Sequence, residues 1–166
     1  MARFEHMAGH LLRRCHQIAG AIFLDECDSF ELTPLQFAVL DSLLHEGPQD
    51  QVTLGGAAAL DRTTISLVIR KLEARGLVRR AQSTQDQRAK IVRITAAGKK
   101  LCLRALPAVE AAQQRIVEPL DGEETGTLLR LLEKLSAGNN RHSRAPAKTL
   151  RIRSRTSIPG RAASKP

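Results

Sequence analysis

The stretch that decides the fold is LDRTTISLVIRKLEARGL, which runs from Leu60 to Leu77. Asp61 is a good N-cap, and Gly76 can take the left-handed conformation that closes a helix. The large apolar side chains between them are spaced i, i+3, i+4 and i+7 and predict one buried helical face: Ile65, Val68, Ile69 and Leu72. The sequence therefore predicts a helix with both of its ends encoded.

The opposite face of this predicted helix is small, hydroxylic and basic. With about 100° of rotation per residue, this face and its flanks comprise Thr63, Thr64, Ser66, Leu67, Arg70, Lys71 and Ala74. A short Ala-rich helix is expected at residues 54–60, after residues 51–53, which can form one strand. Two helices joined by a tight turn make the helix-turn-helix pattern, whose second helix lies in the major groove of DNA.

Two β-prone runs follow, at residues 77–81 and 91–95, with a polar loop at residues 82–90 between them. A hairpin directly after a recognition helix is a wing. Arg88 is expected at the loop tip with Lys90 behind it, and a wing-tip arginine can enter the narrow minor groove of A·T-rich DNA. The alternative for Arg88 is a solvated loop charge.

The net charge of +9 is unevenly distributed along the chain. Residues 62–104 hold 12 Lys and Arg against 2 acidic residues, and residues 138–166 hold 8 against none. Positive charge concentrated around a predicted recognition helix is expected of a protein that binds duplex DNA, whereas a merely basic surface would scatter its charge. Trp and Tyr are absent and Phe occurs four times, which argues strongly against a single-strand binder built on stacked aromatic rings.

Helices are predicted on both sides of this region. The first, at about residues 6–26, is apolar over a wide arc, so it is expected to contact both its own domain and a second subunit. Thr33 and Pro34 begin the next helix, and Gly47 ends it.

A long helix is expected over residues 96–117, capped by Thr95, with Pro107 as a kink or mild break. Asp121 with Glu124 forms a capping-box variant at the start of a last helix. The predicted buried face of that helix is Leu128, Leu131, Leu132 and Leu135. One small winged domain cannot cover all of these terminal helices, so they are expected to form a dimer interface.

The expected fold is mainly α with a small β-wing, a winged helix-turn-helix domain plus N- and C-terminal dimerisation helices. Its expected divisions are a dimerisation and ligand helix at residues 1–30, the DNA-binding domain at 31–98, dimerisation helices at 99–137 and a basic disordered tail at 138–166. The tail has too few large apolar residues to fold alone. It either contacts phosphates that flank the DNA site or contributes nothing.

The chain resembles the MarR family of winged-helix bacterial transcription regulators over about residues 8–137. The resemblance is carried by LTPLQFAVL at residues 32–40, DRTTISLVIRKLEARGLVRR at 61–80 and DQRAKIVRITAAG at 86–98, the last being similar to the family's D-x-R, strand and T-x-x-G pattern. It implies a homodimer that presents two recognition helices and two wings to a pseudo-palindromic operator in double-stranded DNA.

The same resemblance places the DNA-contacting positions of the recognition helix and wing at Arg62, Thr63, Thr64, Ser66, Leu67, Arg70 and Arg88. Lys71 and Lys90 are added from their places on the helix flank and behind the wing tip. Asp86 is implied to brace the wing loop by pairing with a basic residue, not to contact DNA.

The family further implies control by small anionic aromatic ligands bound between the DNA-binding lobe and the dimer helices. LLRRCHQIAGAIF, residues 11–23, is similar to members that respond to hydroxybenzoates or hydroxynicotinates. His10, Arg14 and Gln17 form a polar strip at i, i+4 and i+7, with His16 on the other edge. Arg14 can pair a carboxylate and a histidine can donate to a ring hydroxyl or nitrogen, but a solvated strip is an equal alternative.

The main prediction is a repressor released by such an acid. The alternatives are thiol-based redox sensing at Cys15 or Cys27 in the same fold, although Cys15 is more simply core, and a nonspecific architectural DNA-binding protein. The sequence has no Gly-rich phosphate loop, nucleophile elbow or metal-ligand spacing, so neither an enzyme nor a metal or cofactor is expected. Without a membrane span, secretion signal or C-x-x-C pair, a reducing cytoplasm and no membrane partner are expected.

Overall fold

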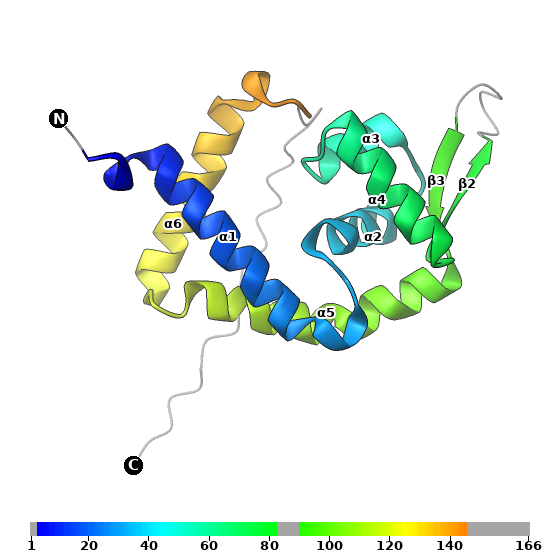
Figure 1. Ribbon diagram of the computed structural model, residues 1–166, viewed down its shortest axis with the longest axis horizontal. Helices are drawn as coiled ribbons and strands as arrows, with labels where there is room; N and C mark the ends of the chain where they lie inside the picture. Colours follow the sequence, from blue (N-terminus) through cyan, green and yellow to red (C-terminus); the bar gives the residue numbers. More distant parts are fainter. Residues whose placement is uncertain (1–2, 83–89, 146–166) are drawn as a thin grey trace, which may run out of the picture.

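The computed structural model describes residues 3–82 and 90–145 (Figure 1). The helices are α1 (Ala8–Glu26), α2 (Pro34–Glu46), α3 (Gln51–Ala57), α4 (Arg62–Ala74), α5 (Ala96–Val117) and α6 (Gly122–Gly138). The strands are β1 (Gln49–Asp50), β2 (Val78–Gln82) and β3 (Lys90–Ile94), and the short 3-10 helices are η1 (Phe4–His6), η2 (Asp28–Phe30) and η3 (Asn140–His142). This order confirms the predicted fold, mainly α with a small β-wing.

The three strands form one antiparallel sheet in the order β1-β3-β2. The predicted hairpin is confirmed, since β2 pairs with β3 from Val78 opposite Ile94 to Gln82 opposite Lys90. The strand expected at residues 51–53 is wrong, because those residues form the first turn of α3. Asp50 accounts for the difference: its carboxylate accepts the backbone N–H groups of Val52 at 2.8 Å and Thr53 at 2.9 Å, which caps a helix at that point.

The predicted helix ends are confirmed wherever a side-chain cap was expected. Thr33 caps α2 in a capping box, and Asp121 caps α6 in another with Glu124. Thr95 accepts from the Gly98 N–H at 3.0 Å and begins α5. The helix α5 continues through Pro107 without a break.

The main core lies among α2, α3, α4, the sheet and the first half of α5. Its fully buried members come from every one of these elements: Val39, Leu40, Leu43, Leu54, Ile65, Ile69, Leu72, Val78, Val92, Cys102 and Ala105. A smaller cluster of Phe23, Cys27, Val109 and Ala112 joins α1 to α5. Phe30 and Phe37 pack against both clusters, so the winged lobe and the α1–α5 pair share a continuous apolar joint.

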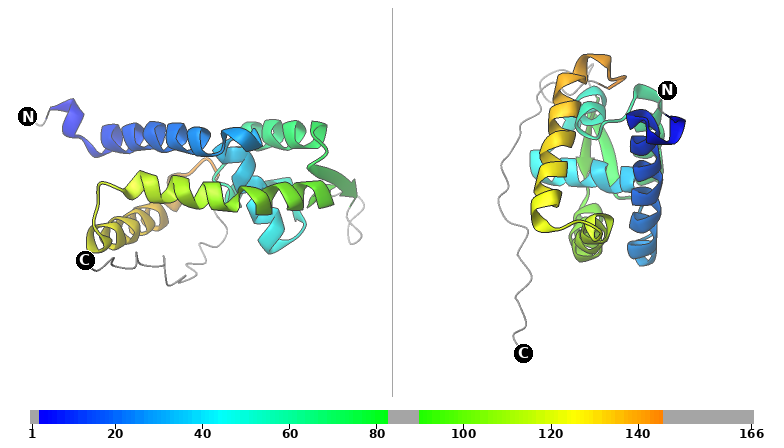
Figure 2. Two further views of the ribbon diagram at one scale, coloured as in Figure 1. Left: turned by 90° about the horizontal axis from the view of Figure 1, so that it is seen from below. Right: turned by 90° about the vertical axis from the view of Figure 1, so that its left-hand side faces the viewer.

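The helix α1 packs on α5 and extends, together with α6, to the end of the molecule opposite the sheet (Figures 1 and 2). Arg115 of α5 ties the two helices together by donating to the carboxylates of Asp25 and Glu26 of α1. The last-helix face predicted to be buried is exposed in the single chain, with Leu128, Leu131, Leu132 and Leu135 between 37% and 52% exposed. Within the described residues, their own chain covers those side chains only in part.

The segment predicted as a disordered tail from residue 138 is partly ordered at its start, because η3 follows α6 directly. Residues 146–166 lie outside the described residues. Within the described residues no single helix is long and apolar enough to cross a membrane, and α3 with α4 passes such a test only as a pair bent by 102°.

Candidate nucleic-acid interface

The recognition helix α4 is fixed at its start by Asp61. The carboxylate of this residue accepts the backbone N–H groups of Thr63 at 2.9 Å and Thr64 at 2.8 Å, and the Thr64 hydroxyl donates to it at 3.1 Å. The bond from the Thr64 N–H, followed by that from its hydroxyl, holds the pKa of Asp61 below its usual range. The first turn of α4 is therefore ordered before any DNA is bound.

The end of α4 is closed by a Schellman motif. Gly76 has φ of 68°, its N–H donates to Glu73 at 2.9 Å, and the Leu77 N–H donates to Leu72 at 2.9 Å. Leu77 is buried against the core. Both ends of the helix are thus rigid, and its outer face is presented in one orientation.

The face of α4 opposite the core is exposed, as its periodicity predicted. Five of the seven helix positions expected to meet DNA are exposed: Arg62, Thr63, Leu67, Arg70 and Lys71. Thr64 and Ser66 are half-buried, and the Thr64 hydroxyl is already engaged by Asp61. Thr64 thus belongs to the helix cap at least as much as to the outer face.

A hollow of about 280 Å³ lies beside α4 and the sheet and is lined by Gln51, Ser66, Arg80, Lys90 and Val92. Arg80 is held there by Glu73, which accepts its backbone N–H at 3.2 Å and its Nη1 at 3.1 Å. The wing residues Asp86 and Arg88 lie outside the described residues. Sequence reasoning missed Arg80, whose signal is its place two residues after the buried Val78, on the same face of β2.

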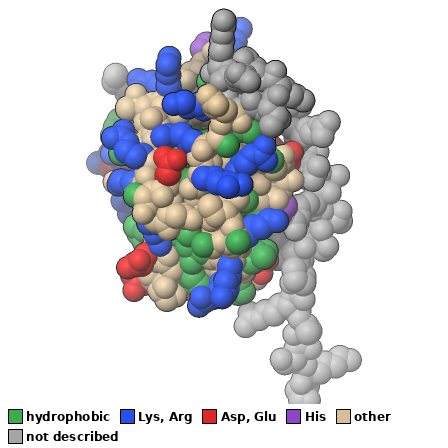
Figure 3. Space-filling view, turned by 90° about the vertical axis from the view of Figure 1, so that its right-hand side faces the viewer, with side chains coloured by type: hydrophobic (Ala, Val, Ile, Leu, Met, Phe, Trp, Pro, Cys, Tyr) green, Lys and Arg blue, Asp and Glu red, His purple; other side chains and the backbone are tan. Residues whose placement is uncertain are grey.

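Among the charged side chains on the side of the sheet, basic ones prevail and few are acidic (Figure 3). Arg79 and Arg93 face each other as cross-strand partners in β2 and β3, and two like charges side by side are unfavourable in a sheet unless an anion lies near. The polyanionic backbone of DNA supplies such charge.

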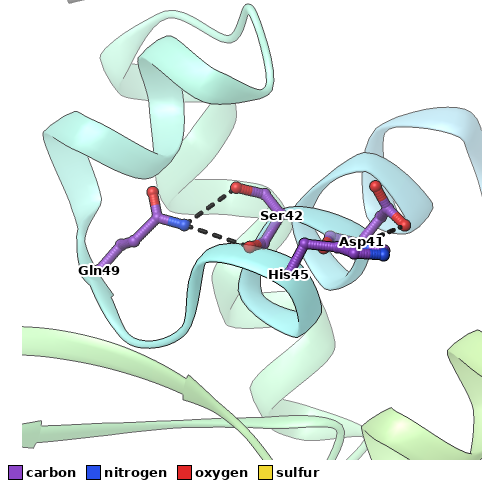
Figure 4. A network of polar contacts seen from close by, with 4 residues as sticks. All are labelled: Asp41, Ser42, His45 and Gln49. Carbon is purple, nitrogen blue, oxygen red and sulfur yellow. Dashed lines mark hydrogen bonds and ion pairs between the residues drawn. The ribbon is translucent and has the colours of Figure 1, made fainter. Parts of the chain in front are cut away.

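The base of the sheet is anchored to α2 by a polar network (Figure 4). Gln49 of β1 donates from Nε2 to the Ser42 hydroxyl at 3.0 Å and to the Ser42 carbonyl at 3.3 Å. On the next turn, His45 Nδ1 lies 3.2 Å from an Asp41 carboxylate oxygen. The Gln49 bonds tie the outer strand β1 to α2, and β1 in turn pairs with β3 of the hairpin.

The residues expected to bind an effector all lie on α1, and the chain alone does not gather them into a pocket. Arg14, His16 and Gln17 are exposed, and none of them lines the hollow beside α4. His10 is half-buried against Phe4, with ring centroids 4.9 Å apart. Its Nδ1 is buried and has no hydrogen-bond partner among the described residues.

The cysteines differ from expectation, because Cys15 is exposed and does not belong to the core. Cys27 and Cys102 are buried, and burial raises the pKa of both thiols, that of Cys102 to about 11. In the described part of the chain, no group of three or more His, Cys, Asp or Glu residues is placed to hold a metal ion.

A capped helix with a hydroxylic and basic outer face, preceded by a short helix and followed at once by an antiparallel hairpin, defines a winged helix-turn-helix DNA-binding protein. Residues 32–90 match the MarR family. The chain is also 34% identical over 127 residues to the transcriptional repressor NicR of Pseudomonas putida, an alignment that covers 76% of this chain and 80% of NicR. The chain belongs to the MarR family and is a transcriptional regulator, not an enzyme.

Solved structures of the same fold agree with this assignment. Bordetella bronchiseptica BpsR, whose DNA binding is regulated by 6-hydroxynicotinic acid, is 33% identical with a TM-score of 0.78, and the match covers 82% of this chain and 97% of BpsR. The repressor CouR, solved on a 23-mer DNA duplex, is 27% identical with a TM-score of 0.74, and the match covers 82% of this chain and 98% of CouR.

Proposed function

We propose that this regulator is a homodimeric repressor that binds a pseudo-palindromic operator and is released by a small aromatic carboxylic acid, such as a hydroxybenzoate or a hydroxynicotinate. The observation that carries the proposal is the outer face of α4, which is capped at both ends and leaves Arg62, Leu67 and Arg70 exposed together. A preordered helix loses little conformational entropy when it enters the major groove.

Each residue proposed for DNA binding has a role that its chemistry suits. Arg70 is suited to bidentate contacts with guanine and Leu67 to contact with a thymine methyl group. The remaining members of the proposed set contact phosphates or bases from the helix and the wing: Arg62, Thr63, Thr64, Ser66, Lys71, Arg88 and Lys90. Arg80 joins them as a phosphate contact, because Glu73 holds it beside Ser66 and Lys90 in the hollow.

The proposed dimer is supported by apolar surface that one chain leaves uncovered. Besides the four leucines of α6, α1 exposes Leu11, Leu12, Ile18 and Leu24, each between 46% and 51% exposed. Leu11 and Ile18 share one face of α1, and apolar faces that a single chain leaves exposed are typical of protein interfaces. A second copy of the chain would cover the exposed apolar side chains of both α1 and α6. It would also bring a second α4 to the same face of the duplex.

The proposed effector site lies on α1, where Arg14 pairs the acid's carboxylate and His10 or His16 donates to a ring substituent, with Gln17 beside them. The likeness to BpsR, whose DNA binding is regulated by 6-hydroxynicotinic acid, supports an aromatic acid as the ligand class. Release requires only that the acid favour a dimer geometry with the wrong helix spacing, a coupling of about 1–3 kcal/mol.

The test begins with an operator selected by the wild-type protein from random duplexes. Binding is then titrated by fluorescence anisotropy with 6-hydroxynicotinic acid and 4-hydroxybenzoate. Arg14→Gln is expected to bind the operator as the wild type does but to resist release, while Arg13→Gln, which removes the neighbouring exposed charge, should respond normally. If no duplex is enriched, operator binding is refuted; if no aromatic acid weakens binding, only the effector claim falls.

Exposure of Cys15 favours one alternative, a thiol-based switch in the same fold. Peroxide would then release the wild-type protein from the operator, and Cys15→Ser would abolish that response while leaving the response to acids intact. The other alternative, a nonspecific architectural protein, is separated by deleting residues 146–166. If the part of the chain before residue 146 recognises the DNA sequence, the deletion flattens the salt dependence of binding but preserves discrimination between sequences.

A further inference from the structure

Arg75 joins the end of the recognition helix to the turn between α1 and α2. It is the C-cap residue of α4, and its side chain reaches a segment 44 residues earlier in the chain. Its Nη1 donates to the carbonyl oxygen of Glu31 at 2.6 Å, and its Nη2 donates to that of Phe30 at 3.3 Å. The Glu31 carboxylate lies 3.8 Å from the same Nη2.

The two carbonyl groups that Arg75 binds stand at the end of η2, where the chain leaves α1. Glu31 there has φ of 50° and ψ of 39°, a left-handed conformation uncommon for a residue other than glycine. The last carbonyl groups of a helix lack partners inside it, and a basic side chain can bind them. Arg75 therefore holds this turn from outside through charge-assisted hydrogen bonds.

This turn is also where the two apolar clusters meet. Phe30, whose carbonyl Arg75 binds, packs against both the core of the winged lobe and the cluster between α1 and α5. At the other end of the link, Gly76 and Leu77 close α4 with two backbone hydrogen bonds directly after Arg75. A rotation of α1 about the Phe30 joint must therefore either move the end of α4 or break the contacts of Arg75.

We propose that Arg75 is a positioning residue that sets the angle between the recognition helix and α1, and with it the distance between the two recognition helices of the dimer. The inference rests on the dimeric operator binding proposed above. A guanidinium on two successive carbonyl groups fixes an angle, whereas a single hydrogen bond leaves a pivot. Because half-sites one turn apart lie about 34–36 Å from each other, a small change in this angle alters which spacing is bound.

The experiment measures affinity against half-site spacing. Duplexes carry two copies of the half-site selected by the wild-type protein, with the spacer shortened or lengthened in single base-pair steps. Arg75→Met keeps the aliphatic stem and removes every donor, and Arg75→Lys keeps the charge but cannot span both carbonyl groups. Arg104→Met is the matched control, because it removes an exposed arginine from α5 with the same change in net charge.

The wild type and Arg104→Met are expected to lose affinity steeply away from one spacing. Arg75→Met should bind that spacing about 2- to 30-fold more weakly, the range for substitutions within a coupling network, and should bind the other spacings with little loss, so its profile flattens. Arg75→Lys should give an intermediate profile. If the Met variant does not fold, this profile alone tests whether Arg75 sets the preferred spacing. If the spacing profile of Arg75→Met is unchanged, or if its affinity falls equally at every spacing, the inference is overturned. If the wild type itself shows no preference for one spacing, the proposed binding of two half-sites by a dimer is overturned instead.

Discussion

Gly98 is the position where the smallest substitution is expected to harm the winged lobe most. It is buried in the first turn of α5, and a Cβ atom there would lie 2.1 Å from the Leu77 carbonyl oxygen and 2.9 Å from Ile94 Cγ1. Protein Cβ atoms essentially never approach other heavy atoms closer than 3.0 Å. In Gly98→Ala the Leu77 carbonyl or the start of α5 must therefore retreat by about 1 Å in a close-packed region.

The expected cost follows from what this retreat disturbs. The Leu77 carbonyl accepts the Thr95 N–H at 3.0 Å and the Thr95 hydroxyl at 3.1 Å, and these bonds join the residue before β2 to the cap of α5. Overpacking costs about 1–3 kcal/mol, and each weakened hydrogen bond up to about 0.5–1.5 kcal/mol. Alanine regains about 1 kcal/mol in a helix. The net loss is about 1–5 kcal/mol, with Tm lowered by about 2–4 °C per kcal/mol.

Urea and thermal unfolding at one fixed protomer concentration measure this loss, because the stability of an oligomer depends on concentration. Gly126→Ala is the matched control, since nothing lies within 4 Å of a Cβ atom at that position of α6. It should gain about 0.5–1 kcal/mol from helix propensity. If Gly98→Ala proved as stable as Gly126→Ala, the close approach of α5 to Leu77 would be refuted.

Three further substitutions test the interface, the dimer and the pH dependence. Arg70→Ala should weaken operator binding by about 1–3 kcal/mol and relax the preference for one base, as read by competition with single-base variants; equal weakening on every duplex would make Arg70 a phosphate contact. Leu132→Asp should yield monomers in sedimentation velocity, whereas Val52→Asp, at an exposed position of α3, should leave assembly unchanged. The raised pKa of Cys102 means that the folded state favours the protonated thiol, so this contribution to stability is complete below pH 9 and is lost as the pH rises towards 11. Cys102→Ala should remove part of that decline in thermal melts between pH 8 and 11, and an identical decline would exclude Cys102 as its source.

The ends of the helices were predictable because their signals are local. Asp61, Thr95 and Asp121 each act on backbone N–H groups two or three residues ahead, so a short stretch of sequence contains the whole interaction. The hairpin was predictable for a similar reason, since both strands and their connection lie within about twenty residues. The same local signal was overlooked at Asp50, which is why α3 begins earlier than expected.

The contacts that could not be predicted from the sequence are long-range. Arg75 gave no signal of its bonds to Phe30 and Glu31, because nothing in a periodic pattern links positions 44 residues apart. Periodicity also cannot say what covers an apolar stripe. It marked Leu132 and its neighbours as buried and Cys15 as core, whereas a single chain leaves both exposed. The roles of the DNA-contacting and effector residues remain predictions for the experiments above.

The geometry of α1 connects the dimer to the effector. Leu11, Arg14 and Ile18 are spaced i, i+3 and i+7, so the arginine shares its face with two exposed apolar side chains. Arg13 lies about 100° from Arg14 around the helix, away from that face. A partner subunit that covers Leu11 and Ile18 must also take the Arg14 guanidinium out of water, which is costly unless an anion pairs with it. A carboxylate ligand meets that need at the surface whose packing sets the spacing of the two recognition helices, so effector binding and dimer geometry are expected to change together.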